Sequence, residues 1–166
     1  MKSEKDIYLS QNFGKSLYKR ITKHPDYIFY KAVTIHRKYK LAKEKNKKIK
    51  SIIYAFYANR IASKYNLELY GKFGENLRIW HGNIIINGDA ILGNNCNLHG
   101  NNCIGEKNGK SPIIGNNVDI GYGTVIIGDI SIANNIVIGA NSLVNKSFNE
   151  EGVIIAGCPA KIIKKI

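Results

Sequence analysis

The sequence has few residues that cross-link or stiffen a chain, and it has no long apolar run. Only 3 of its 166 residues are Cys and only 3 are Pro, which excludes a small domain held together by many disulfides. No stretch of about 18 apolar residues occurs, so no membrane-spanning helix is expected. The first residues are polar and of mixed charge, so no signal peptide is expected either. These absences favour a reducing, cytoplasmic setting.

The positive charge of the chain is confined to its first part. Residues 1–66 contain 17 Lys and Arg against 4 Asp and Glu, and residues 67–166 contain 8 of each, so the net charge of +13 lies entirely in the first segment. The composition changes at the same point, since 15 of the 16 glycines follow it. We therefore expect a basic extension over residues 1–66 and a second, differently built domain over residues 67–166.

The basic extension is predicted to be helical. Pro25 suits the first turn of a helix. Farther along, apolar residues recur every three or four positions, as expected for one face of a second helix: Ile49, Ile52, Ile53, Phe56, Tyr57, Ile61 and Ala62. Two interpretations stay open, a solvated basic cap and a surface for anionic lipid or a polyanionic acceptor. The second would hold the protein peripherally on the inner face of a membrane. Nucleic acid is not expected as a partner, because no recognised binding motif accompanies the charge.

A six-residue period runs through the second domain. Its aliphatic positions are separated by six residues, except for one interval of ten from Ile104 to Ile114. They are Ile86, Leu92, Leu98, Ile104, Ile114, Ile120, Ile126, Ile132, Ile138 and Val144. Neither a helix nor a simple strand repeats every six residues. The period predicts short strands joined by tight turns, three to a coil, stacked as a solenoid with these residues inside. Cys96 falls in an interior slot. The cysteines have no metal-ligand spacing, so no metal is expected.

This repeat resembles that of the hexapeptide-repeat acyltransferases, and the segment 156–163 (AGCPAKII) resembles their closing segment. The resemblance implies a mainly β fold, a left-handed parallel β-helix, with acetyl-CoA as acyl donor. It also implies a homotrimer with sites between neighbouring subunits. Within the family, residues 77–82 (LRIWHG) resemble the segment that carries the catalytic His in the serine acetyltransferase-like branch. That branch also contains sugar acetyltransferases of surface-polysaccharide pathways.

His81 is the first candidate for a general base. An imidazole has an ordinary pKa near 6.5 and suits removal of a hydroxyl proton. The resemblance assigns His81 the catalytic position, and the spacing from Ile79 to Ile86 is seven residues instead of six. Such an irregularity can turn a side chain outward into a cleft. Glu68 is the candidate to orient His81, with an ordinary surface acid as the alternative.

His99 is the second candidate histidine. It follows His81 by 18 residues, three repeats of six, so it is expected one coil away and near the same cleft. There it could contact the acceptor or transfer a proton. The alternative is a polar residue at a corner of the solenoid.

Two departures from the branch's pattern concern the acceptor. Trp80 stands where the branch has an acidic residue that contacts serine, and Lys110-Ser111 stand where it has an Arg-His pair. An exposed aromatic residue suits a sugar ring, so the expected acceptor is a sugar hydroxyl of a cell-surface polysaccharide (capsule or lipopolysaccharide) or of its precursor. Packing of Trp80 in the interior is the alternative for that residue. Serine O-acetyltransferase of cysteine biosynthesis is the alternative activity, and a non-catalytic trimeric scaffold is the alternative of another class.

The resemblance also implies a groove for acetyl-CoA. Residues 105–111 (GEKNGKS), at the loop Glu106–Pro112, resemble a phosphate-binding loop, but only three residues separate the two glycines and Pro112 stands where a helix should follow. A nucleoside triphosphate site is therefore rejected. In the family such a loop arches over the active site. The residues expected to line the groove are Gly105, Lys110, Gly121, Gly123, Ala140 and Lys161.

Overall fold

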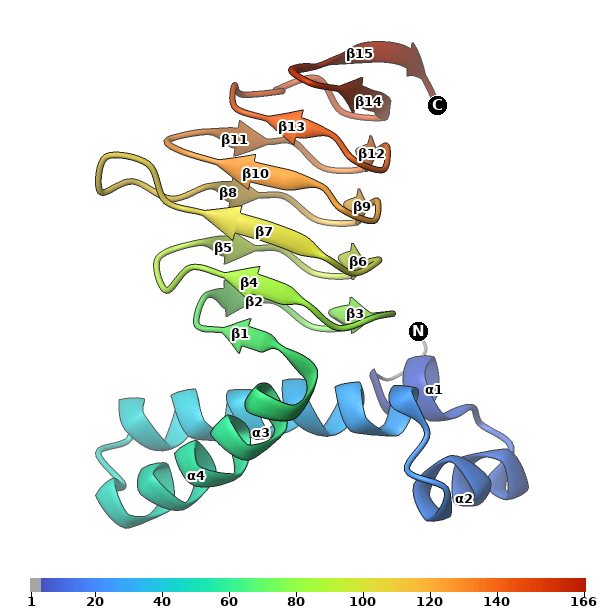
Figure 1. Ribbon diagram of the computed structural model, residues 1–166, viewed down its shortest axis with the longest axis vertical. Helices are drawn as coiled ribbons and strands as arrows, with labels where there is room; N and C mark the ends of the chain where they lie inside the picture. The colour runs from blue at the N-terminus through green and yellow to red at the C-terminus, as the bar shows by residue number, and fades with distance from the viewer. Residues whose placement is uncertain (1–3) are drawn as a thin grey trace. The chain divides into compact units, whose positions relative to one another are not determined.

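The computed structural model describes residues 4–166, and the chain divides into two compact units, Met1–Leu67 and Glu68–Ile166. The unit boundary falls one residue after the change in composition. The first unit consists of α1 (Glu4–Leu9), α2 (Phe13–Ile21), α3 (Pro25–Glu44) and α4 (Lys48–Tyr65) (Figure 1). Helix α3 begins at Pro25, as predicted, and the side chain of His24 caps it by accepting a hydrogen bond from the backbone N–H of Asp26. Within residues 4–166, no helix is both long and apolar enough to cross a bilayer.

Helix α4 exposes the apolar residues that predicted it. Ile49 is 76% exposed and Phe56 is 61% exposed, and Ile52, Ile53 and Tyr57 on the same face are also exposed. Helix α4 packs against α3, yet none of its own residues is buried. The sequence pattern therefore marks an apolar surface on this helix and no interior, which differs from the usual amphipathic helix of a globular core.

The second unit is a solenoid of short strands stacked in three sheets (Figure 1). Sheet A contains β1 (Leu67–Leu69), β4 (Ile84–Ile86), β7 (Asn102–Gly105), β10 (Val125–Ile127) and β13 (Leu143–Val144). Sheet B contains β2 (Lys72–Phe73), β5 (Ile91–Leu92), β8 (Ile113–Ile114) and β11 (Ser131–Ile132). Sheet C contains β3 (Arg78–Ile79), β6 (Asn97–Leu98), β9 (Asp119–Ile120), β12 (Val137–Ile138), β14 (Val153–Gly157) and β15 (Ala160–Lys165).

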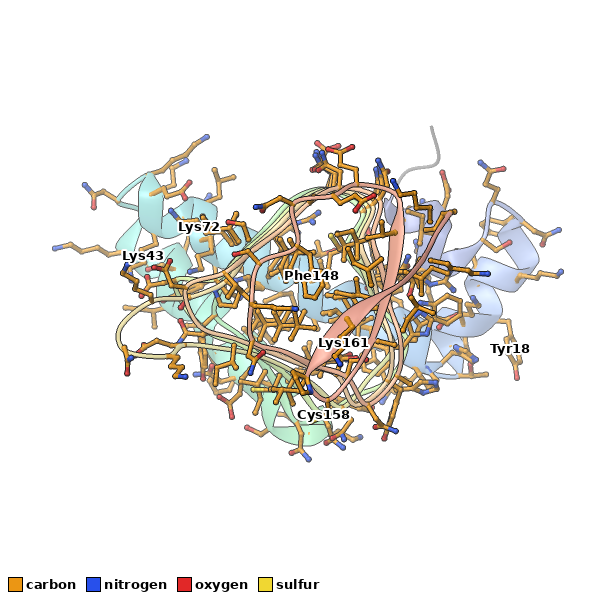
Figure 2. The ribbon with its side chains drawn as sticks, turned by 90° about the horizontal axis from the view of Figure 1, so that it is seen from above. Tyr18, Lys43, Lys72, Phe148, Cys158 and Lys161 are labelled. Carbon is orange, nitrogen blue, oxygen red and sulfur yellow. The ribbon has the colours of Figure 1, made fainter. Side chains whose placement is uncertain are left out.

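The strands pair in parallel, and β15 alone among those described folds back antiparallel on β14. This architecture confirms the predicted left-handed parallel β-helix with a helical N-terminal region. Every aliphatic residue of the predicted six-residue series is at most 3% exposed. Phe148 closes the stack from above, inside the triangle of strands (Figure 2). The six-residue period predicts the interior residues because each strand buries one residue, in register with the buried residue of the coil below.

The corner between sheets B and C is held by a ladder of asparagines. Asn76, Asn95, Asn117 and Asn135 all adopt the left-handed conformation, with φ between 56° and 59°. Each amide donates to the next amide oxygen, at 2.9 Å from Asn76 to Asn95, 3.0 Å from Asn95 to Asn117 and 2.9 Å from Asn117 to Asn135. Asn tolerates a positive φ better than other side chains do, so one residue type serves both the turn and the ladder.

Candidate functional site

The corner at which sheet C passes into sheet A carries His81; we call it the His81 corner and define it as residues 80–83, 99–101, 121–124 and 139–142. His81 lies between β3 and β4, and its side chain is exposed. Because Ile79 pairs with Leu98, Leu98 with Ile120 and Ile120 with Ile138, His81 falls in register with Gly100, Tyr122 and Ala140 in successive coils. The predicted base therefore occupies an outward turn at one edge of the solenoid.

Gly100 makes room for His81. Gly100 has a φ of 116°, and a Cβ added there would lie 2.6 Å from the Cβ of His81 and 3.1 Å from Cε2 of Tyr122. Only glycine fits both the backbone conformation and this space. Tyr122 is thereby brought close to the same turn, although nothing in its sequence context pointed to a role.

The expected position of His99 is wrong by one residue. Three repeats of six would align His99 with His81, but successive coils are offset by 19 residues here, as the pairing of Ile79 with Leu98 shows. The extra residue is the irregularity that the sequence shows between Ile79 and Ile86. His99 consequently lies over Trp80, with ring centroids 5.6 Å apart and ring planes 11° from parallel.

Trp80 lies outside the solenoid and is 38% exposed, so its packing in the interior is wrong. The guanidinium of Arg78 covers its ring, with Cζ 3.6 Å from the ring centroid. His99, stacked on the same indole, holds its Nε2 2.6 Å from Oδ1 of Asp119. Arg78 and Asp119 lie on strands of sheet C, and Trp80 and His99 lie on the adjoining His81 corner. The four side chains form a continuous polar and aromatic row, which we call the Arg78–Asp119 row.

Sequence reasoning missed Arg78 and Asp119. A signal existed, because each directly precedes an interior aliphatic residue, Ile79 or Ile120, and therefore must point outward. Asn97 occupies the equivalent position in the coil between them. Neither residue stands at a position of the catalytic segment to which the family resemblance assigns a role.

Glu68 lies on β1, on the outer face of sheet A. Its carboxylate is close enough to Cys103, two strands away, to contribute to raising the pKa of that thiol, after the larger effect of burial. Within residues 4–166, Glu68 forms no ion pair with His81. The orientation of His81 by Glu68 stays a prediction.

Three of the expected groove residues lie on the His81 corner itself. Gly121, Gly123 and Ala140 occupy its upper coils, and Gly121 is so close to the next coil that an added Cβ would lie 2.6 Å from the backbone N of Ala140. Lys161 continues the series at the top, since it pairs with Ala156 of β14. Figure 2 shows Lys161 near Cys158 where β14 turns into β15. With strands about 4.8 Å apart, the corner provides a narrow outward strip of small residues beside the exposed ring of Tyr122, and the strip ends at a lysine.

Gly105 and Lys110 lie at the opposite end of sheet A, in and beside the loop that follows β7 (Figure 1). Lys107 and Lys110 bridge the loop, and Lys110 forms an ion pair with Asp129 of the next coil. The hydrogen bond and the charge of that carboxylate raise the pKa of Lys110. Within one chain the width of sheet A separates this loop from His81.

The cysteines differ in their surroundings. Cys96 is buried in the predicted interior slot, and burial raises its pKa to about 11. Cys103 is half-buried and Cys158 is exposed. Among residues 4–166, no cluster of three or more His, Cys, Asp or Glu side chains is arranged to hold a metal ion.

Comparison with protein-family models finds no match. Among curated proteins, the chain is 31% identical over 121 residues to the serine acetyltransferase of Buchnera aphidicola subsp. Schizaphis graminum, a match that covers 68% of this chain and 46% of that protein. It is 35% identical over 99 residues to the serine acetyltransferase of Staphylococcus epidermidis, covering 57% of this chain and 46% of that protein. The chain thus spans about half the length of the curated relatives it matches.

Solved structures have the same fold. Soybean serine acetyltransferase complexed with serine superposes with a TM-score of 0.73 at 22% identity, covering 82% of this chain and 58% of that chain. A serine acetyltransferase in complex with CoA superposes with a TM-score of 0.71 at 22% identity, covering 82% of this chain and 57% of that chain. At this level of identity these similarities establish the fold alone.

Proposed function

We propose that this protein is an acetyl-CoA-dependent O-acetyltransferase in which His81 acts as the general base. The observation that carries the proposal is the position of His81 on an exposed corner whose upper coils present small residues and end at Lys161. An imidazole beside an open strip of backbone suits a long thioester carrier that approaches one reactive hydroxyl. The relatives named serine acetyltransferase support the same reaction type.

The chemistry requires a direct attack and the passage of one proton through His81. His81 accepts the proton of the acceptor hydroxyl while the oxygen attacks the thioester carbonyl, and the tetrahedral intermediate expels the CoA thiolate, which takes that proton from His81. General-base catalysis of this kind contributes about 10²- to 10⁴-fold to the rate. Glu68 and His99 are proposed to assist, Glu68 by orienting His81 and His99 by contacting the acceptor. No step requires a metal.

Serine is the first candidate acceptor. The expectation of a polysaccharide acceptor gains no support from the comparisons, because the relatives reported above are serine acetyltransferases. A sugar hydroxyl is the second candidate, favoured by the partly exposed ring of Trp80 beside His81. Since Arg78 already lies over that ring, a sugar would stack only on the part of the indole that Arg78 and His99 leave uncovered.

The donor is proposed to bind along the His81 corner. The backbone of Gly121, Gly123 and Ala140 would line the pantetheine arm, and Lys161 would meet the phosphates. Gly105 and Lys110 belong to the other end of sheet A, so their contribution requires a neighbouring subunit. We therefore propose a homotrimer with each site between two copies.

The helical unit is proposed to contact an anionic membrane surface through α4. The helix that carries this exposed apolar face also contains Lys48, Lys50, Arg60 and Lys64 and no acidic residue. A basic helix with one apolar face suits the interface of an anionic bilayer. Two copies of α4 packed face to face would instead bring like charges together. The protein would then work in the cytoplasm, at the inner face of a membrane.

A thiol-release assay with acetyl-CoA tests the activity. The full chain is incubated with L-serine and with a panel of neutral and acidic sugars, and free CoA is measured. Release that depends on serine supports the first candidate, and release only with sugars selects the second. If the chain binds acetyl-CoA in no assay and releases no thiol, the scaffold interpretation replaces the proposal.

A further inference from the structure

We propose that Arg78 is an anion-binding residue that selects a hydroxyl acceptor carrying a carboxylate. The inference rests on the proposed function in one respect, the use of His81 as the base for that hydroxyl. Its structural basis is separate and lies in the contacts of Arg78 with its neighbours in the Arg78–Asp119 row.

Arg78 is a cation without a counter-ion. Among residues 4–166, no Asp or Glu forms an ion pair with its guanidinium. Arg78 shares a column of outward-pointing residues with Asn97 and Asp119 in the next two coils. The carboxylate of Asp119 is already paired with His99, whose Nε2 lies 2.6 Å from Oδ1 of Asp119. The row therefore presents one uncompensated positive charge at its lower end.

The guanidinium is also held in place. Its Cζ lies 3.6 Å from the centroid of the Trp80 ring, and that ring is stacked in turn on His99. Stacking on an aromatic face leaves the in-plane N–H groups of Arg free to bind an anion with two parallel hydrogen bonds. Because Trp80 directly precedes His81, an anion bound there would lie beside the proposed base.

The position of Arg78 beside the proposed base suits an acceptor that carries a carboxylate better than a neutral acceptor. In serine, two carbon atoms separate the hydroxyl from the carboxylate, and the same spacing separates the 4-hydroxyl of a hexuronic acid from its carboxylate. Either molecule could place its carboxylate on Arg78 and its hydroxyl toward His81. The shared chemistry is thus a carboxylate two carbons from a reactive hydroxyl.

The fluorescence of Trp80 tests the inference directly, since Trp80 is the protein's single tryptophan. The full chain is titrated with L-serine and L-serinamide, and with glucuronate and glucuronamide. We expect the acids to change the emission and the matched amides to have no effect. In Arg78→Met the affinity for the acids should fall about 10- to 100-fold, the range for a lost charge-assisted pair. Arg78→Lys should recover part of it, and Lys72→Met, which removes an exposed cation of sheet B, should bind as the wild type does.

The outcomes separate the two proposals. A response to serine alone or to glucuronate alone supports the site and identifies its source of carboxylate. If the amides bind as well as the acids, or if no acid changes the emission, the Arg78 site is overturned. This comparison uses the wild-type chain, so it does not depend on the folding of a variant. Acids that bind without any thiol release from acetyl-CoA would refute acetyl transfer and leave the Arg78 site standing. If thiol release depends on serine and Arg78→Met leaves the KM for serine unchanged, acetyl transfer is supported and the Arg78 site is refuted.

Discussion

Gly100 and His81 lie so close that a Cβ on residue 100 would come within 2.6 Å of the Cβ of His81. The two residues occupy equivalent turns in successive coils, and the glycine also adopts a φ of 116°. The position of the proposed base thus depends on the absence of a side chain one coil above it.

We expect Gly100→Ala to displace His81 and lower kcat by about 10²-fold, the lower range of a general base's contribution. The control is Gly152→Ala, which places a methyl group at a φ of 66° with no atom within 4 Å. Both variants add strain at a positive φ, but only the first crowds His81. Steady-state kinetics and thermal melts measure both effects, and equal activity of the two variants would contradict the argument.

His81→Ala should reduce kcat at least about 10²-fold and leave the KM for acetyl-CoA nearly unchanged, because the imidazole acts on the acceptor. His24→Asn is the matched control, since Asn also caps a helix and residue 24 lies in the helical unit. Near-normal turnover of His81→Ala would remove His81 from the role of base.

The buried thiol of Cys96 should make stability depend on pH. Its pKa is raised from 9.0 to about 11 in the folded protein, so between these values the unfolded chain loses the proton and the folded chain keeps it. Unfolding is therefore favoured as pH rises through this window, with a slope of up to about 1.4 kcal/mol per pH unit. Urea unfolding at pH 8, 9 and 10 should show a smaller decline for Cys96→Ala than for the wild type. Identical declines would show that other groups cause it.

The asparagine ladder should contribute measurably to stability. Asn117→Ala removes two amide hydrogen bonds and places alanine at a φ of 56°, so we expect a loss of about 2 to 3 kcal/mol. Asn117→Gly removes the hydrogen bonds but accepts the backbone conformation, so it should cost less. Chemical unfolding measures the free energy of unfolding of both variants. A larger loss of stability in Asn117→Gly than in Asn117→Ala would refute the contribution assigned to the backbone conformation.

The exposed face of α4 should mediate binding to anionic vesicles. We expect the chain to co-sediment with vesicles that contain phosphatidylglycerol, less so with pure phosphatidylcholine, and less again at high salt. The double variant Ile52→Ser/Phe56→Ser should lose this binding. Ile113→Ser, which removes an isoleucine of the solenoid that is 52% exposed, should retain it. If the double variant instead changes the oligomeric state in sedimentation equilibrium and vesicles are not bound, the face joins copies of the chain.

Much of the solenoid could be predicted from the sequence because its order is local. A residue such as Ile104 is interior by virtue of its place in a six-residue repeat, and the same rule assigns Ile126 and Ile138 without any long-range information. The charge of residues 1–66 and the candidacy of His81 also follow from the sequence, the latter through an irregular spacing and a resemblance.

The site required the tertiary structure because it joins residues from different coils. One extra residue in the turn after Ile79 shifts the register by one, so His99 lies over Trp80 and Gly100 lies over His81. The seven-residue spacing from Ile79 to Ile86 shows in the sequence that the register changes, but it does not show which side chains then meet. The contacts of Arg78 and Asp119, and the exposure of the apolar face of α4, likewise depend on what lies across a coil or beside a helix. The sequence by itself determined the repeat and the interior, and the packing of successive turns decided which side chains meet outside it.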